Sequence, residues 1–112
     1  MQNETVLAET VAFLTRDGMR IPFIEKDARL PIDKTELFTT ARDNQETIRV
    51  HLVQGETSIV ELEFPILARV PRGVPKISLT VRVSSAGELS LTFKEPETTN
   101  ILDRGGLAVL IR

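Results

Sequence analysis

The chain contains no cysteine, no tryptophan and no tyrosine, and it has only one histidine among its 112 residues. Without cysteine, the chain can form neither disulfide bonds nor thiolate metal sites. Its five phenylalanines are the only aromatic residues, which argues against the stacking of nucleic-acid bases on an aromatic platform. A metal centre needs a cluster of ligands, and no such cluster accompanies His51. We therefore expect no metal or other cofactor in this chain and interpret His51 as a surface residue.

An excess of charge of one sign and long hydrophobic runs are also missing. The 14 basic and 16 acidic residues leave a net charge of -2, which gives no electrostatic reason to expect nucleic acid or an anionic membrane as a partner. No apolar stretch approaches the length that crosses a bilayer, and the first residues show no secretory signal. We therefore expect a cytoplasmic protein that binds neither nucleic acid nor membrane.

The usual components of an enzyme active site are absent as well. No serine lies in a nucleophile-elbow context, and no glycine-rich phosphate loop is present. The isolated pair Gly105 and Gly106 reads as a flexible hinge. Glu61 and Glu63 face the same way along their run and are expected on an exposed strand face rather than as an acid–base pair. These absences favour a protein that is not an enzyme.

The dominant pattern in the sequence is an alternation of apolar and polar residues. It runs through residues 48–52, 60–64, 77–83 and 89–93. Successive side chains of a strand point to opposite faces, so each run predicts a strand with one buried and one solvated face, as in antiparallel sheets. Glycine-containing turns at 54–56, 72–73 and 85–87 separate the runs. We predict an all-β, antiparallel two-layer β-sandwich formed by residues 1–112 as a single domain.

The two ends of the chain are less regular. Residues 5–14 and 19–25 are predicted to form two strands around a turn at Asp17 and Gly18, and residues 27–37 a loop around Pro31. Residues 33–36 have the spacing of a helix capping box, but the sequence that follows does not continue as a helix. Residues 105–112 are apolar and rich in strand-forming residues, and residues 101–112 are expected to supply a last strand.

Two longer motifs carry a family resemblance. The segment from Phe38 to Gln45, Phe-Thr-Thr-Ala-Arg-Asp-Asn-Gln, is followed by Gln-Gly-Glu at residues 54–56. Residues 71–77 read Pro-Arg-Gly-Val-Pro-Lys-Ile, and Ala-Gly-Glu-Leu follows at residues 86–89. In this order, the motifs resemble those of the substrate-binding β-domain of the DnaK-type, seventy-kilodalton heat-shock chaperones. The resemblance covers roughly residues 5–99.

The resemblance implies a sandwich whose loops hold an extended hydrophobic peptide of an unfolded protein, with backbone hydrogen bonds and one apolar pocket. It implies that any ATPase activity lies in a nucleotide-binding domain of a parent chaperone. That nucleotide-binding domain would be a further partner of this chain. The positions that match the family's peptide pocket are Phe38, Ile48, Val50, Phe13, Val11, Met19, Ile77 and Gly73. The positions that match its arch and backbone-pairing loops are Thr39, Ala41 and Arg16.

A second interpretation stays open at this point. Phe38, Ile48, Val50 and Ile77 are also residues that the core of any sandwich would contain. Arg16 could place a charge over the cleft, which would shift preference toward peptides with acidic flanks or occlude the site. Residues 2–4 are polar where the family has a hydrophobic interdomain linker, which argues against coupling to an ATPase. No helical lid is expected, so we expect fast peptide release. The alternative is a structural or assembly β-sandwich that has lost or occluded its peptide site and self-associates through the open cleft.

Overall fold

The computed structural model describes residues 5–39, 45–66, 76–95 and 98–112. This part of the chain contains eight strands and no helix, so no helix there is long and apolar enough to cross a membrane. In chain order, the strands are β1 (Val11–Leu14), β2 (Arg20–Ile24), β3 (Ile32–Phe38), β4 (Thr47–Gln54), β5 (Thr57–Pro65), β6 (Ile77–Val83), β7 (Glu88–Lys94) and β8 (Ile101–Ala108).

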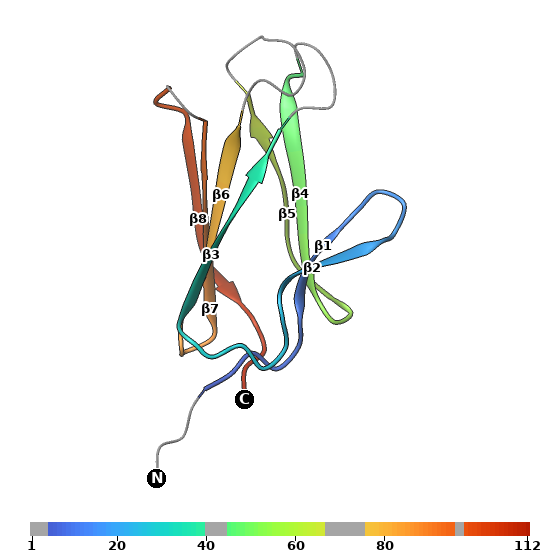
Figure 1. The fold of residues 1–112 in the computed structure, drawn as a ribbon, viewed down its shortest axis with the longest axis vertical. Helices are drawn as coiled ribbons and strands as arrows, with labels where there is room; N and C mark the ends of the chain where they lie inside the picture. Colours follow the sequence, from blue (N-terminus) through green and yellow to red (C-terminus); the bar gives the residue numbers. More distant parts are fainter. Residues whose placement is uncertain (1–4, 40–44, 67–75, 96–97) are drawn as a thin grey trace.

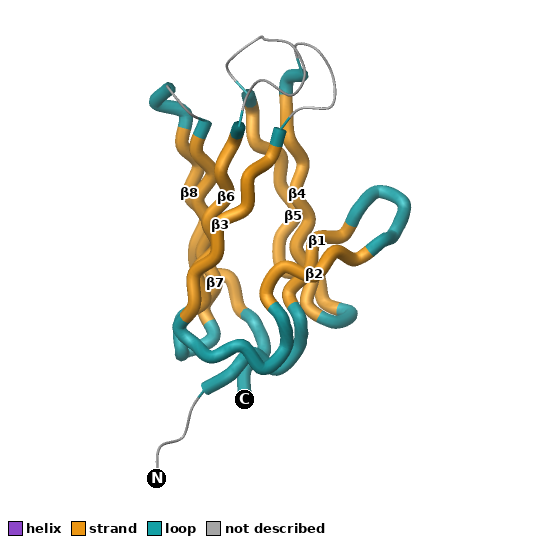
Figure 2. The backbone as a smooth tube through the Cα atoms, viewed as in Figure 1, coloured by secondary structure: helices purple, strands orange, loops and turns teal. Residues whose placement is uncertain are grey.

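The strands form two antiparallel sheets of four strands each. Their strand orders are β2-β1-β4-β5 and β3-β6-β7-β8, and the two sheets form two layers (Figure 1). The chain passes from the first sheet to the second through residues 25–31, at the end of the molecule where both described termini lie (Figure 2). The predicted all-β sandwich is confirmed.

The core lies between the two sheets and follows the alternation of the sequence. Every second residue of β6, from Ile77 to Val83, is almost completely buried. The phenyl rings of Phe64 on β5 and Phe93 on β7 are stacked, with their centroids 4.9 Å apart. This ring pair connects the two layers, and burial of each such side chain contributes roughly 1.5–3 kcal/mol.

Glycine closes the predicted hairpin turns. Gly18, between β1 and β2, and Gly87, between β6 and β7, have φ angles of 84° and 83°, which favour glycine. At Gly87 the backbone also passes close to the end of the chain, because a Cβ atom there would lie 3.1 Å from the carbonyl oxygen of Val109. The turns that the sequence predicts at Asp17 and Gly18, at 54–56 and at 85–87 are confirmed, and the turn predicted at 72–73 lies outside the described residues.

The segment of residues 27–37, predicted as a loop, is the clearest correction. Most of it belongs to β3, which pairs with β6 along its whole length, from Ile32 opposite Val83 to Phe38 opposite Ile77. Most of its side chains are exposed because β3 is an edge strand. The strand therefore depends on backbone pairing with a distant segment, which its own side-chain pattern does not reveal.

Two strand boundaries also differ from the prediction. The first strand begins at Val11 rather than at residue 5, because residues 6 and 7 form only isolated bridges. The last strand begins at Ile101, where the expected last strand of residues 101–112 begins, but it ends at Ala108. Gly105 and Gly106 lie inside this strand, where two residues oppose Ser90 alone, and Gly106 has a φ angle of 72°. They form a β-bulge rather than a hinge.

Candidate functional site

A hollow of about 410 Å³ opens where the β1–β2 hairpin leaves the layers of the sandwich. The turn end of this hairpin projects away from the two layers (Figure 1). Strand β1 pairs with β4 only as far as Phe13 opposite Leu52. Beyond this pair, the edge of β4 that faces β1 has no partner strand at residues 49–51 in the described part of the chain. The other edge of β4 pairs with β5 there. The hollow is lined by this edge, by β1 and β2, and by β3 of the other sheet, so only the tertiary structure assembles it.

Aromatic rings form one wall of the hollow. The ring of Phe13 lies with its centroid 4.8 Å from that of Phe23 on the neighbouring strand and 5.6 Å from that of Phe38 on β3. The Phe13–Phe38 pair has an edge-to-face arrangement with an interplanar angle of 88°, a favourable geometry for aromatic pairs. Both rings are only partly buried. The wall therefore presents apolar surface that the core does not use.

Exposed apolar side chains form the rim of the same hollow. Ile21 on β2 and Leu37 on β3 both line it and are 50% and 62% exposed. Met19, in the hairpin turn next to β2, is exposed as well. These are three of the five large hydrophobic side chains found exposed among the described residues. Such a concentration of exposed apolar surface is typical of a binding site.

A second, smaller hollow of about 360 Å³ adjoins the first. It is lined by Leu14, Thr15, Arg16, Arg49 and His51, and all of these except Arg16 also line the larger hollow. Figure 1 shows that the hairpin bearing residues 14–16 diverges from β4. This divergence separates the two strands that carry the lining residues.

Polar contacts position the β4 side chains of the smaller hollow. Arg49 forms an ion pair with Glu61 on β5. The Nε2 atom of His51 lies 2.8 Å from the Ser58 hydroxyl, and its Nδ1 atom lies 3.7 Å from the Glu61 carboxylate. His51 lies on the polar strand face, as predicted, but it has a carboxylate neighbour that its own strand does not reveal. Glu61 becomes that neighbour because the β4–β5 register places it opposite His51.

Two further contacts hold the strands around the site. Lys34 on β3 donates a hydrogen bond of 2.6 Å to the carbonyl oxygen of Phe23, and its ammonium lies 5.4 Å from the Phe23 ring centroid. This contact joins β3 to β2. In the hairpin turn, the Thr15 hydroxyl donates to the Asp17 carboxylate at 2.7 Å. This hydrogen bond is the main cause that lowers the pKa of Asp17.

The residues predicted for a peptide site fall into four groups. Phe13, Phe38 and Val50 line the larger hollow, and Arg16 lines the smaller one. The side chains of Val11, Ile48 and Ile77 are buried in the core and line neither of these hollows, and that of Val50 is buried as well. Those exposed beside the hollow or at the end of β3 are Met19 and Thr39. Ala41 and Gly73 lie outside the described residues.

Sequence reasoning missed several lining residues. They are Leu14, Thr15, Ile21, Pro22, Glu36, Leu37, Arg49 and His51. Ile21 and Leu37 could have been found from the sequence as exposed apolar residues. Each is a large apolar residue next to proline or a charged residue, in a segment without clear alternation of apolar and polar residues. The others line the hollow only because β1 diverges from β4, and this divergence has no local signal.

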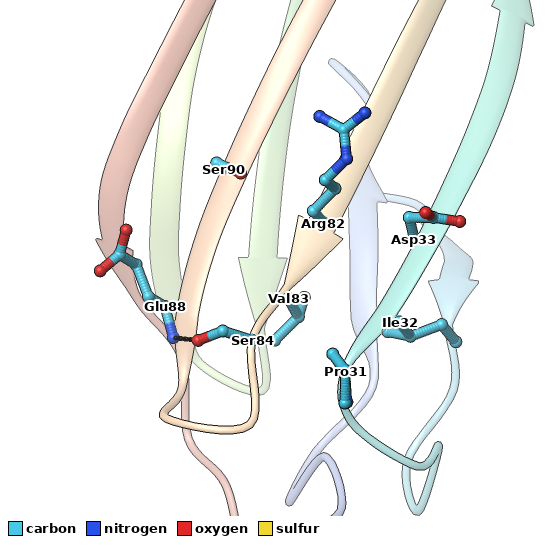
Figure 3. A pocket seen from close by; sticks show the side chains of 8 residues that line it. All are labelled: Pro31, Ile32, Asp33, Arg82, Val83, Ser84, Glu88 and Ser90. Carbon is cyan, nitrogen blue, oxygen red and sulfur yellow. Dashed lines mark hydrogen bonds between the residues drawn. The ribbon is translucent and has the colours of Figure 1, made fainter.

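A third hollow, of about 610 Å³, lies on the outer face of the second sheet. Its side chains are spread over three strands and do not converge on one point (Figure 3). Asp33, Arg82 and Glu88 give it mixed charge, and the Ser84 hydroxyl accepts hydrogen bonds within its own turn. It contains none of the predicted site residues, so we do not assign the site there. Among the residues described, no three potential metal ligands cluster anywhere.

Comparison with known proteins adds evidence independent of this geometry. Residues 4–102 match the sequence profile of the family described as Hsp70 protein. The chain is 33% identical over 96 residues to chaperone protein DnaK of Carsonella ruddii, a match that covers 80% of this chain and 16% of that protein. The values for DnaK of Thermoplasma acidophilum are the same. The match to DnaK of Nitrosopumilus maritimus is 34% identical over 93 residues and covers 77% of this chain and 15% of that protein.

Proposed function

The chain belongs to the Hsp70 protein family, and from this premise we propose that it is a chaperone module that holds extended hydrophobic segments of unfolded proteins. The observation that carries the proposal is the 410 Å³ hollow between the sheets, with its aromatic wall and exposed apolar rim. In this proposal the module works in the cytoplasm and catalyses no reaction itself. ATP-driven control would come from a nucleotide-binding domain, which the matched segment does not include.

The geometry supports binding of an extended chain in two ways. The edge of β4 that faces β1 has no partner strand among the described residues at positions 49–51, so it offers backbone groups to a peptide in strand conformation, and this pairing is insensitive to sequence. The hollow, whose volume falls within the range of small binding pockets, accepts an apolar side chain.

Simple energetics then predict a weak and tolerant site. Burial of one Leu or Ile side chain contributes roughly 1.5–3 kcal/mol, and each backbone hydrogen bond adds about 0.5–1.5 kcal/mol net. After the costs of association, these terms give an affinity on the order of micromolar. Such tolerance suits a chaperone, because unfolded proteins share apolar segments and not a common sequence.

Fluorescence anisotropy with a labelled heptapeptide that has leucines at its centre tests this function. We expect saturable binding by the chain and at least about tenfold weaker binding of the same peptide with serine in place of leucine. Ile21→Ser should weaken binding of the leucine peptide about three- to tenfold, because it removes apolar rim surface. If the unaltered chain binds no leucine peptide up to millimolar concentration, the proposal is wrong.

Ile101→Ser is the matched control for the rim variant. Ile101 is 52% exposed and lies on β8, in the other sheet, whereas Ile21 is 50% exposed and lines the hollow. The two substitutions therefore remove a similar amount of exposed apolar surface. We expect Ile101→Ser to leave peptide affinity unchanged within about twofold. Equal losses from both variants would point to general surface stickiness rather than to a site.

The assembly function is the second candidate. It is favoured by the exposed apolar side chains at β2 and β3, which are edge strands of the two sheets and therefore available for pairing with another copy of the chain. Arg16 lines only the smaller hollow and is not among the residues around the larger one. Light scattering separates the two candidates. A stable oligomer that leucine peptide does not dissociate would favour assembly, and a monomer that binds peptide would favour the chaperone module.

A further inference from the structure

The smaller hollow beside the apolar one has a cationic lining. Arg16, Arg49 and His51 contribute to it, and no carboxylate does. It shares four lining residues with the larger hollow, so the two form one continuous depression with an apolar part and a basic part. A ligand that fills the apolar part therefore has the basic part next to it.

The three basic side chains differ in the contacts that they already make. Arg49 is paired with Glu61, and His51 lies between Ser58 and the same carboxylate. The guanidinium of Arg16, in contrast, takes part in no ion pair or hydrogen bond with another described residue. Arg16 is exposed, so it can pair with an incoming anion without first breaking an existing contact.

No carboxylate lines the smaller hollow, but Glu61 on β5 contacts its lining residues Arg49 and His51. Glu36 lines the larger hollow from β3, and neither Glu36 nor Asp17 lines the smaller one. The carboxylate of Asp17 is held by the Thr15 hydroxyl. An anionic group on the ligand is therefore opposed on the β3 side, where Glu36 lies, and favoured beside Arg16, because Glu61 already pairs with Arg49.

We propose that this depression selects extended peptides in which an acidic residue lies one or two positions from the apolar residue held in the larger hollow. Residues of an extended chain are about 3.3 Å apart along the strand, so such an acidic side chain reaches the adjoining hollow. Arg16 acts as the main specificity-determining residue, and Arg49 and His51 complete the basic lining. This inference rests on the proposed peptide-binding function.

Anisotropy titrations with three labelled peptides test the inference. The peptides share a central Leu-Leu pair and differ only in the flanking residues, which are glutamate, glutamine or lysine. We expect the order of affinity glutamate, glutamine, lysine, with roughly a three- to fivefold difference at each step in low salt. The differences should shrink when ionic strength is raised, because screening weakens interactions between exposed charges.

Variants of Arg16 identify the responsible residue. Arg16→Gln should reduce the preference for the glutamate peptide over the glutamine peptide to less than about twofold. Arg16→Lys should retain most of the preference, and Arg16→Glu should invert it. Arg104→Gln removes the same charge from an exposed position on β8, in the other sheet, and should leave the preference intact.

The outcomes separate this inference from the function on which it rests. Binding of all three peptides with equal affinity would overturn the inference and leave the proposed function standing. Equal effects of Arg16→Gln and Arg104→Gln would also overturn it, because they would show a response to net charge alone. Failure of every peptide to bind would overturn both proposals. Circular dichroism of each variant checks that the sandwich is intact.

Discussion

The side chain of Gln54 forms two hydrogen bonds with the backbone of Leu110. Its Nε2 atom donates to the Leu110 carbonyl oxygen at 2.9 Å, and its Oε1 atom accepts from the Leu110 N–H at 2.7 Å. The same Nε2 atom donates to the Glu9 carbonyl oxygen at 3.2 Å. Gln54 is only 2% exposed. The glutamine of the Gln-Gly-Glu motif therefore fastens two segments near the ends of the chain to the end of β4.

Replacement of Gln54 by leucine should lower the free energy of unfolding by about 2–4 kcal/mol. The substitution removes these three hydrogen bonds and leaves the Leu110 N–H without its partner, whereas the Leu110 carbonyl oxygen still accepts from the Ala8 N–H. Urea denaturation followed by circular dichroism measures the change. Gln54→Glu should cost a similar amount, because a carboxylate would face two carbonyl oxygens. A loss below about 0.5 kcal/mol in both variants would contradict this structural role.

Two phenylalanines distinguish the lining of the candidate site from the core. Phe64 is completely buried and stacked on Phe93, whereas Phe13 is partly buried and lines the hollow. Phe64→Leu should lower the free energy of unfolding by about 1–2 kcal/mol and leave the dissociation constant for leucine peptide within twofold. Phe13→Leu should cost less stability and weaken peptide binding about threefold or more. If both variants alter stability and binding in parallel, the aromatic wall is core and not binding surface.

The close approach at Gly87 should be measurable as a difference between two glycines. Gly18 and Gly87 have nearly the same positive φ angle, but only at Gly87 would a Cβ atom meet a backbone oxygen, at 3.1 Å. Gly18→Ala should cost about 1 kcal/mol of unfolding free energy for its backbone conformation. Gly87→Ala should cost about 1–2 kcal/mol more, because the segment around Val109 must shift. If thermal or urea unfolding gives the same loss of unfolding free energy for both variants, the segment around Val109 shifts without a measurable cost.

The hydrogen bond from Thr15 to Asp17 predicts a pH effect of known sign. The pKa of Asp17 is lowered from its ordinary value of 3.8, mainly by the Thr15 hydroxyl and also by its own backbone N–H. A lowered pKa in the folded state stabilises the fold above the unfolded value of 3.8, and this contribution is lost as the pH falls through the folded value.

NMR titration of the Asp17 carboxyl in the unaltered chain and in Thr15→Val measures this effect directly. The variant should raise the Asp17 pKa toward 3.8, because the largest cause of its depression is removed. Thr15→Ser keeps the hydroxyl and should leave the pKa low. An unchanged Asp17 pKa in Thr15→Val would show that the turn backbone alone lowers it.

The sequence by itself determined the strands that have a clear alternation, the hairpin turns between them and the sandwich class. Alternation is a local property, since successive side chains of a strand point to opposite faces, and β4, β5, β6 and β7 all follow it. The motifs around Phe38 and Gln54 also indicated the family that the comparisons establish. The pattern could not identify β3, because an edge strand with exposed side chains is held by backbone pairing with a distant strand.

Only the tertiary structure decided where the candidate site lies. Phe13 and Phe38 come from different sheets and meet only when the layers pack. The hollow exists because β1 stops pairing with β4 after Phe13, and this divergence places Arg16 beside Arg49 and His51. Contacts of this kind depend on the relative placement of segments far apart in the chain. No local alternation or turn preference specifies that placement, so neither the wall of the hollow nor its charge could be predicted in full from the sequence.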